Sequence, residues 1–141
     1  MINDIVTTKA LLDKIEAFAT LNNYGLSKQG FKFTPEPTET YLRETFLPNV
    51  IDPLGLSATS SDRQDPIYQI DIYTAKGQGG PWPAREIVNL IKAEFPKYSF
   101  VVNTAEQKVQ VYTISGREMT ANDTHNWTMV NIELIVMASN T

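Results

Sequence analysis

Residues 66–95 carry, one directly after the other, the two periodic patterns that most restrict how this chain can fold. The segment Pro66–Ala75 alternates between apolar and polar side chains, the period of a strand with one buried face. The next apolar residues recur at the spacing of one helical face: Ala84, Ile87, Val88, Ile91 and Phe95. A strand followed at once by an amphipathic helix predicts a core between the two elements.

The turn between these two elements contains Gly77, Gly79 and Gly80, so we weighed it as a phosphate-binding loop. A phosphate cradle of that kind needs a lysine and a hydroxyl residue at the start of the helix. Here the glycines are followed by PWP, and both prolines lack the backbone N–H that a phosphate would use. We therefore interpret this turn as a hinge, with Trp82 available for packing or for contact with a partner.

The rest of the chain shows weaker but readable patterns. A helix is predicted over Ile5–Leu21, whereas residues 22–39 and Ser115–Asn126 are predicted to be loops. The remaining strand patterns are Thr40–Phe46, a short Phe100–Val102, Val109–Ile114 and Trp127–Met137. Together they predict one α+β domain over residues 1–141, with a mostly antiparallel sheet of about four strands and two helices packed on one face.

Composition excludes several classes of function. The net charge of -4 disfavours a protein that binds nucleic acid through a basic face. The absence of cysteine excludes disulfides, thiolate zinc sites and cysteine nucleophiles. The N-terminal segment is charged from Asp4 onward and has no uninterrupted apolar core, so we expect no signal peptide, no membrane partner and assembly in the cytoplasm.

No motif predicts a reaction centre. His125 is the sole histidine, and we interpret it as a surface residue, so a histidine metal pair and a histidine-activated nucleophile are both disfavoured. The aspartates of residues 52–65 lack the spacing of a calcium loop. Glu44, Asp71 and Glu133 lie on predicted strands and could converge, which leaves a small enzyme or ligand-binding domain as an alternative. We expect no catalytic residue, no cofactor and no metal.

The segment Leu47–Asp65 is rich in turn-forming residues and is unusually long for a loop in a compact domain. Aliphatic side chains in such a loop suit a neighbouring subunit better than a monomer core. We therefore expect this segment to be mobile in the free subunit and ordered between subunits. The predicted interface consists of Val50, Ile51, Leu54, Leu56, Arg63 and Trp82.

At this point the residues resemble a known family. The order of TYLRETFLPN, the strand YQIDIYTAKGQG and the helix WPAREIVNLIKAEF resembles that of tail-terminator-like proteins from long-tailed bacteriophages. The matching motifs are Tyr41-Leu42-Arg43 with Leu47-Pro48, then Tyr68–Tyr73, then Gly77 and Gly79. The resemblance covers most of the chain, but Pro66-Ile67 stands where the family often has a glycine.

The resemblance implies a virion protein without catalytic residues. It implies a six-membered ring that caps the tail tube, ends tube polymerisation and forms the tail side of the head–tail joint. The implied partners are further copies of the chain, the tail tube protein and a head-side connector or neck protein, with DNA passing through the ring without specific binding. The alternative within this class is another neck or head–tail completion protein.

Overall fold

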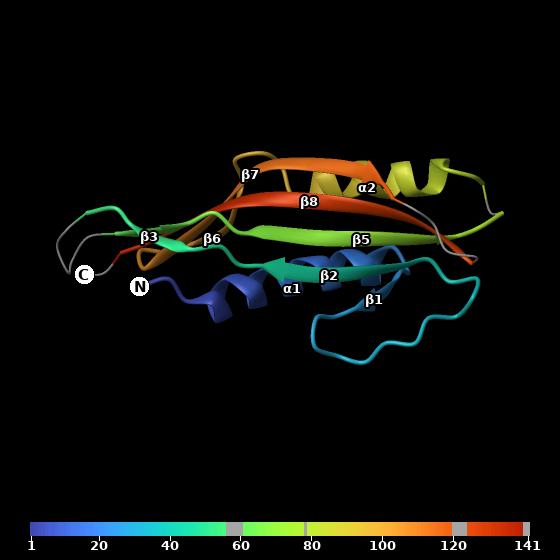
Figure 1. Cartoon of the computed structure of the whole chain (residues 1–141), viewed down its shortest axis with the longest axis horizontal. Helices are drawn as coiled ribbons and strands as arrows, with labels where there is room; N and C mark the ends of the chain where they lie inside the picture. The colour runs from blue at the N-terminus through green and yellow to red at the C-terminus, as the bar shows by residue number, and fades with distance from the viewer. Residues whose placement is uncertain (56–60, 78, 120–123, 140–141) are drawn as a thin grey trace.

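A computed structural model describes residues 1–55, 61–77, 79–119 and 124–139 of the chain. Within these residues, two helices accompany one eight-stranded sheet (Figure 1). The helices are α1 (Asp4–Leu21) and α2 (Trp82–Glu94). The strands are β1 (Gly25–Ser27), β2 (Tyr41–Leu47), β3 (Ile51–Pro53), β4 (Asp62–Gln64), β5 (Ile67–Ala75), β6 (Phe100–Asn103), β7 (Gln107–Glu118) and β8 (His125–Ala138).

Both helices begin and end for local reasons. The side chain of Asn3 caps α1 by accepting a hydrogen bond from the backbone N–H of Ile5. Asn23 follows the helix with a φ of 59°, a left-handed conformation that asparagine tolerates. In α2, Pro83 stands in the first turn, where its missing N–H leaves no helical hydrogen bond unmade. The buried faces of the two helices supply Leu11, Ile15, Phe18, Ile87 and Ile91 to one hydrophobic core.

Four long strands, in the order β2, β5, β8 and β7, form the antiparallel centre of the sheet. The even-numbered residues of β5 and β8 face the helices and, apart from the half-buried Asn126, are buried, as a period of two predicts for a sheet with one covered face. The odd-numbered residues of β8 point to the opposite face, where most of them are at least partly accessible to solvent. We call this the uncovered face of the sheet.

The strands β2 and β3 pair with β5 and β4 as the two sides of one long hairpin. Gln64 pairs with Val136 of β8, and Ile67 pairs with Glu133, so β4 and β5 follow β8 in one register with only a two-residue interruption. On the other side of the hairpin, β3 pairs with β4 as β2 pairs with β5. The outer part of this hairpin, residues 48–55 and 61–66, is named the hairpin arm below.

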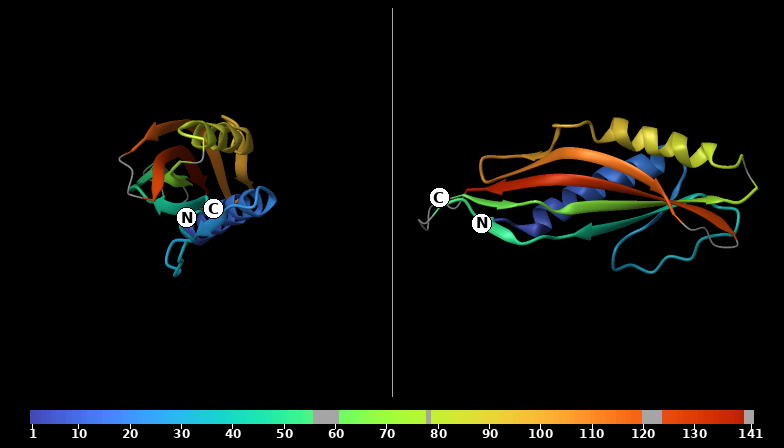
Figure 2. Two further views of the ribbon diagram at one scale, coloured as in Figure 1. Left: turned by 90° about the vertical axis from the view of Figure 1, so that its right-hand side faces the viewer. Right: turned by 45° about the horizontal axis from the view of Figure 1, so that its top comes forward.

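The sheet curls into a half-barrel around the core (Figure 2). The helix α1 contacts β1 and β2 at one edge of the sheet and β6 at the other, so it fills the opening that the curl leaves. Beside it, α2 contacts β5, and Val88 lies against the backbone of Gly116 in β7. The amino group of Met1 donates a 3.0 Å hydrogen bond to the carbonyl of Ser139, which places the two ends of the described chain together (Figure 1).

The prediction of an α+β fold with about four antiparallel strands is therefore wrong. The part of the chain that the structure describes is mostly β. Its eight strands form a mixed sheet, because β1 runs parallel to β2. Four of these strands have only three or four residues. Strands this short carry no readable alternation, because their stability comes from hydrogen bonds to segments distant in sequence.

The predicted loops are also shorter in the structure. The segment Leu47–Asp65 contains β3 and β4, which are already formed within a single chain, and residues 22–39 contain β1. The predicted loop Ser115–Asn126 begins later and ends earlier, because β7 continues to Glu118 and β8 starts at His125. Polar residues at these strand ends lie in the sheet because the end of β7 pairs with β8 as far as the pair Glu118–Thr128, and the start of β8 pairs with the end of β5.

Candidate interaction surfaces

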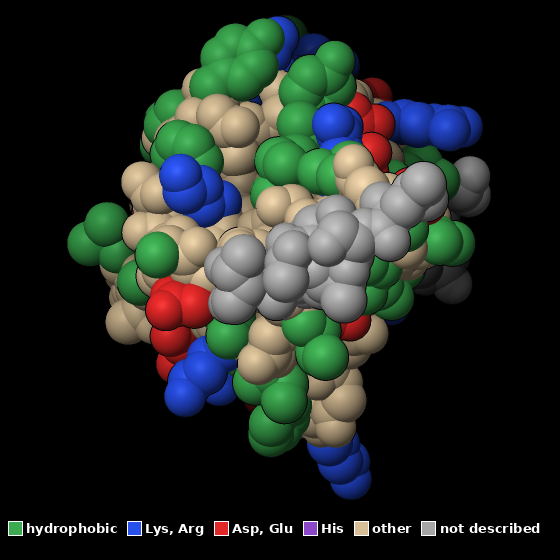
Figure 3. Space-filling view, turned by 90° about the vertical axis from the view of Figure 1, so that its left-hand side faces the viewer, with side chains coloured by type: hydrophobic (Ala, Val, Ile, Leu, Met, Phe, Trp, Pro, Cys, Tyr) green, Lys and Arg blue, Asp and Glu red, His purple; other side chains and the backbone are tan. Residues whose placement is uncertain are grey.

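The hairpin arm exposes a group of aliphatic side chains. Val50 is 72% exposed and Leu54 is 51% exposed, while Ile51 and the neighbouring Leu47 are also classed as exposed. In Figure 3, which views this end of the molecule, hydrophobic side chains lie on several sides of the surface, between charged groups. Leu56, which was also predicted to belong to the interface, lies outside the described residues. The arm therefore presents apolar surface that its own subunit leaves uncovered.

The free backbone edge of the arm offers few hydrogen-bond donors. The N–H of Leu54 donates to the carbonyl of Ser61 at 2.8 Å, which fixes the alternation of inward and outward groups along β3. By this alternation, Pro53 occupies a position whose N–H would point outward, and proline has none. Side-chain packing is consequently a better way to make contact here than the addition of a further strand.

Arg63 lies on β4 and is paired within its own subunit. Its Nε donates a 2.9 Å hydrogen bond to Oδ1 of Asp65, and its Nη2 lies 3.4 Å from Oδ2 of the same residue. Both partners are substantially exposed, so this ion pair contributes little to stability. The guanidinium is nevertheless held in one orientation on the uncovered face.

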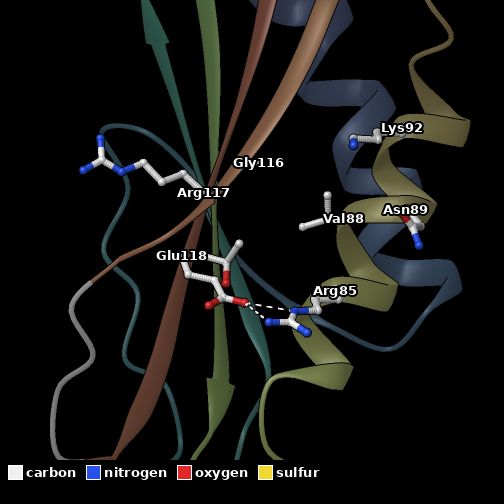
Figure 4. A pocket seen from close by; sticks show the side chains of 8 residues that line it. Arg85, Val88, Asn89, Lys92, Gly116, Arg117 and Glu118 are labelled. Carbon is white, nitrogen blue, oxygen red and sulfur yellow. Dashed lines mark hydrogen bonds and ion pairs between the residues drawn. The ribbon is translucent and has the colours of Figure 1, made fainter.

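Trp82 lies at the end of the molecule opposite to the hairpin arm, because α2 begins there (Figure 1). Its ring is 64% exposed, and the guanidinium of Arg85 lies 4.9 Å from the ring centroid. Arg85 also forms a 3.0 Å ion pair with Glu118 across a shallow groove between α2 and β7 (Figure 4). The residues predicted as a single interface therefore occupy two separate places, four of them on the arm and Trp82 at the other end.

The glycines before α2 have the backbone geometry of a turn. Gly77, Gly79 and Gly80 all have positive φ values, which other residues adopt only with strain. The residue that precedes the helix is Pro81, and no side chain caps the helix start. The turn thus reverses the chain from β5 into α2, as the interpretation from the sequence stated.

The three strand carboxylates do not converge. Glu44, which is 5% exposed, points into the core, while Asp71 points to the uncovered face and Glu133 lies exposed on β8. Glu44 accepts hydrogen bonds from the hydroxyl of Tyr68 at 2.9 Å and from the backbone N–H of Gln29 at 2.6 Å. Burial raises the pKa of Tyr68 well above its ordinary value, and the neighbouring Glu44 raises it further. This pair is a structural tie rather than an acid–base centre.

Asp71 organises a network that the sequence pattern did not reveal. Its carboxylate has no exposed surface and accepts from Nε and Nη2 of Arg43, from Nε1 of Trp127 and from the amide of Gln69. Alongside it, the rings of Tyr41, Tyr73 and Trp127 stack in a row across three strands. Residues that lie directly opposite each other on neighbouring strands form such rows. The sequence alone did not predict which strands are neighbours.

His125 was interpreted as a surface residue, and this interpretation is wrong. The ring is buried at the start of β8, where Nε2 lies 2.8 Å from the carbonyl oxygen of Glu39 and Nδ1 lies 2.9 Å from the hydroxyl of Thr124. The imidazole also meets the ring of Tyr41 edge-on. It therefore anchors residues 28–40 to the sheet, because β8 begins earlier than its polar sequence suggested.

The described residues contain neither a metal-binding cluster nor a membrane-spanning helix. No three histidine or acidic side chains among them are grouped so that they could hold a metal ion. None of the helices that the structure describes is long and apolar enough to cross a membrane.

Comparisons with known proteins identify a protein family and a shared fold. The family model described as phage tail terminator protein matches residues 7–134. No curated protein sequence matches the chain. One solved structure superposes with a TM-score of 0.71 at 21% sequence identity, and the match covers 99% of this chain and 97% of that one. At this identity, the structural similarity shows a shared fold alone.

Proposed function

We propose that this chain, which belongs to the phage tail terminator protein family, caps the end of a phage tail tube. In this proposal, copies of the chain form a closed ring of six subunits that stops tube polymerisation. The tube-facing side of the ring binds the last tube subunits, and the other side presents the tail to a head-side connector or neck protein. The protein acts by contact and catalyses no reaction.

The observation that supports this proposal best is the hairpin arm. It carries exposed aliphatic side chains, Val50 and Leu54 among them, on a rigid two-stranded extension of the sheet. Because β4 pairs with both β3 and β8, the arm is held in place before any partner binds. Fully burying one such side chain against another protein contributes about 1.5–3 kcal/mol, and a preformed arm loses little further entropy on binding.

A closed ring needs two different surfaces that fit each other on neighbouring subunits. The hairpin arm is one such surface, and it lies at the end of the molecule opposite to Trp82. We infer that the arm of one subunit packs on its neighbour, and that the Trp82 end is available to the tube or to the connector.

The direct test is whether the protein limits the growth of tubes. Tail tube subunits of the same phage would be polymerised with increasing amounts of the protein, and tube lengths measured by electron microscopy. We expect shorter tubes with protein density at their ends. Unchanged tube lengths with bare ends would remove the terminator assignment.

The role of the arm is tested by replacing Val50 and Leu54 with aspartate in one variant. We expect this variant to fold but to leave tube lengths unchanged. The matched control is Phe31→Asp, which changes an exposed apolar residue outside the arm and should cap normally. Equal capping by both variants would show that the arm is not the contact surface.

The purified protein also tests the expectation that it does not bind DNA. A ring of six subunits, each with a net charge of -4, would carry a charge of -24 and repel the phosphate backbone. We therefore expect no duplex binding in a gel shift at physiological salt. Micromolar binding by the isolated protein would contradict the proposal that DNA passes through the ring without adhering.

A further inference from the structure

A groove of about 550 Å³ lies between α2 and the last part of β7 (Figure 4). Its principal lining residues are Arg85, Val88 and Lys92 from α2, and Gly116, Glu118 and Thr128 from the sheet. Arg117 also borders the groove, but its side chain points away from α2 (Figure 4). The amine of Lys92 extends from the helix toward the strands (Figure 4). We call this feature the α2 groove.

The α2 groove contains a cation that its own chain does not neutralise. Arg85 and Glu118 form a 3.0 Å ion pair across the groove and so balance each other. Lys92 is exposed, and its amine makes no hydrogen bond or ion pair with any residue that the structure describes. An anionic group that enters the groove therefore meets an unpaired lysine.

The edge of β7 adds a backbone donor beside this cation. On the side away from β8, the described residues provide β7 with backbone partners only as far as Val111. The N–H of Met119 donates to the carbonyl of Trp127 at 2.8 Å, so every second residue before it, Arg117 first, also bonds to β8. The N–H of Gly116 consequently points away from β8 and has no acceptor among the described residues. The α2 groove thus suits a carboxylate.

A turn before β2 presents a matching carboxylate. The N–H of Glu36 donates to Oε2 of Glu39, and the N–H of Glu39 donates to the carbonyl of Glu36, each over 3.0 Å. The carbonyl oxygen of Glu39 lies 2.8 Å from Nε2 of the buried His125, which ties the turn to the sheet. Glu36 is exposed, and its carboxylate has no hydrogen bond or ion pair within the part of the chain that the structure describes. We name residues 35–39 the acidic turn.

The acidic turn and the α2 groove lie on opposite sides of the molecule, at the same end. Figures 1 and 2 show the segment between β1 and β2 extending from one side and α2 running along the other, both in the half that is remote from the hairpin arm. The turn of a chain therefore does not reach the groove of the same chain. A second copy that stands beside the first in the same orientation brings its acidic turn to that groove, which is a heterologous contact.

We propose that the α2 groove of one copy binds the acidic turn of a neighbouring copy, with the carboxylate of Glu36 paired to the amine of Lys92. This inference rests on the proposed ring. The chain carries both halves of the contact, and two unpaired groups of opposite charge on separate sides give it direction and specificity. Pro35 and Pro37 limit the backbone freedom of the turn, so little further entropy is lost when it binds.

Carbodiimide cross-linking of the unchanged protein tests this contact, because the reagent joins a carboxylate and an amine only where the two meet. Isotopically labelled and unlabelled protein would be mixed at high concentration without tube subunits and treated with the reagent. Trypsin then releases residues 33–43, which contain Glu36, joined to residues 86–97, which contain Lys92. We expect mass spectra to show this product with labelled and unlabelled peptides combined. Products that join Glu36 to other lysines and not to Lys92, or that never combine the two labels, would overturn the proposal.

One variant and its control identify the amine. Lys92→Gln removes the amine from the groove and should lose the covalent dimer. The matched control is Lys97→Gln, which changes an exposed lysine outside the groove and should keep the dimer. Equal dimer yields from the two variants would contradict the assignment.

An exchange of charges tests the same pair in the assembled state. Glu36→Lys and Lys92→Glu each place like charges together, so each should raise the concentration needed to cap tubes about tenfold. The variant with both changes restores opposite charges and should cap nearly as well as the unchanged protein. A loss of capping with Lys92→Glu but not with Glu36→Lys would assign the groove to a different protein and overturn the proposal.

The result is separable from the test of the proposed function. The cross-linking uses the protein without tube subunits, so it reports on the contact between copies whether or not tubes are capped. Failure of the unchanged protein to cap tubes would remove the terminator role and leave the cross-linked product as measured. Normal capping without the product that joins Glu36 to Lys92 would remove this contact alone.

Discussion

The hydroxyl of Tyr68 donates a 2.9 Å hydrogen bond to Glu44 inside the core, between the adjacent strands β5 and β2. The second carboxylate oxygen of Glu44 accepts from the backbone N–H of Gln29, while the side-chain oxygen of Gln29 accepts from the N–H of Phe46. One buried acid thus ties the segment after β1 to the centre of the sheet. Each of these polar groups is satisfied, which is what makes their burial tolerable.

The first prediction concerns this tie. Tyr68→Phe leaves Glu44 with one donor fewer in the core, so the free energy of unfolding should fall by about 1–3 kcal/mol at neutral pH. The folded protein raises the pKa of Tyr68, so this group favours folding fully below its unfolded pKa of about 10, and this contribution is lost as the pH rises further. Denaturant melts should therefore show that the difference in the free energy of unfolding between the unchanged protein and Tyr68→Phe becomes smaller above pH 10. A gap that widens there would contradict the assignment.

The second prediction concerns the buried stripe of α2. Ile91 is fully buried at its centre, so Ile91→Ala should lower the free energy of unfolding by about 2–5 kcal/mol. Lys92 is the matched position on the exposed side, and Lys92→Ala should be nearly neutral. Denaturant melts measure both. Equal losses for the two variants would refute the orientation of the helix.

The third prediction concerns the buried carboxylate of Asp71. Asp71→Asn removes the negative charge that accepts hydrogen bonds from Arg43. It also replaces one acceptor oxygen by an amide donor that faces Trp127 or Gln69. We therefore expect the free energy of unfolding to fall by about 1–3 kcal/mol. Asp65→Asn is the control, because Asp65 forms an exposed ion pair with an arginine, Arg63. This change should lower the free energy of unfolding only slightly. Thermal or denaturant melts compare the two. A larger loss at Asp65 would mean that the network is not a stabilising feature.

The fourth prediction concerns proteolysis and reverses an expectation from the sequence. Leu47–Asp65 was expected to be mobile in the free subunit, which would allow trypsin to cut early after Arg63. In the structure, Arg63 lies in β4 and is paired on both sides, by Asp52 of β3 and by Met137 of β8. We therefore expect slow cleavage there, because a protease needs an unpaired extended chain. Lys32, in the exposed segment before β2, should be cut first.

Mass spectrometry of early digestion products measures this order. Cleavage at this site is easy to identify, because Arg63 is the sole basic residue between Arg43 and Lys76. Early products that end at Arg63 would show that the hairpin arm opens in the free subunit. The arm would then be an element that becomes ordered on assembly, as the sequence alone suggested.

The sequence by itself determined the elements whose stability is local. The stripe of α2, the proline in its first turn and the alternation of residues 66–75 all follow from side-chain periodicity over adjacent residues, and the structure places each element where the pattern predicted it. The glycine turn was likewise readable, because the positive φ values of Gly77, Gly79 and Gly80 are a property of the residue type.

Only the tertiary structure decided how these pieces join. Strand pairing makes strands of Asp62–Gln64 and Ile51–Pro53, although they lie in a segment rich in turn-forming residues. The strand β8 pairs with β4 from 70 residues or more away in the chain, and β4 pairs in turn with β3. Pairing also sets the burial of His125 and the row of stacked rings. Register is a property of two strands at once, so no single stretch of sequence contains it.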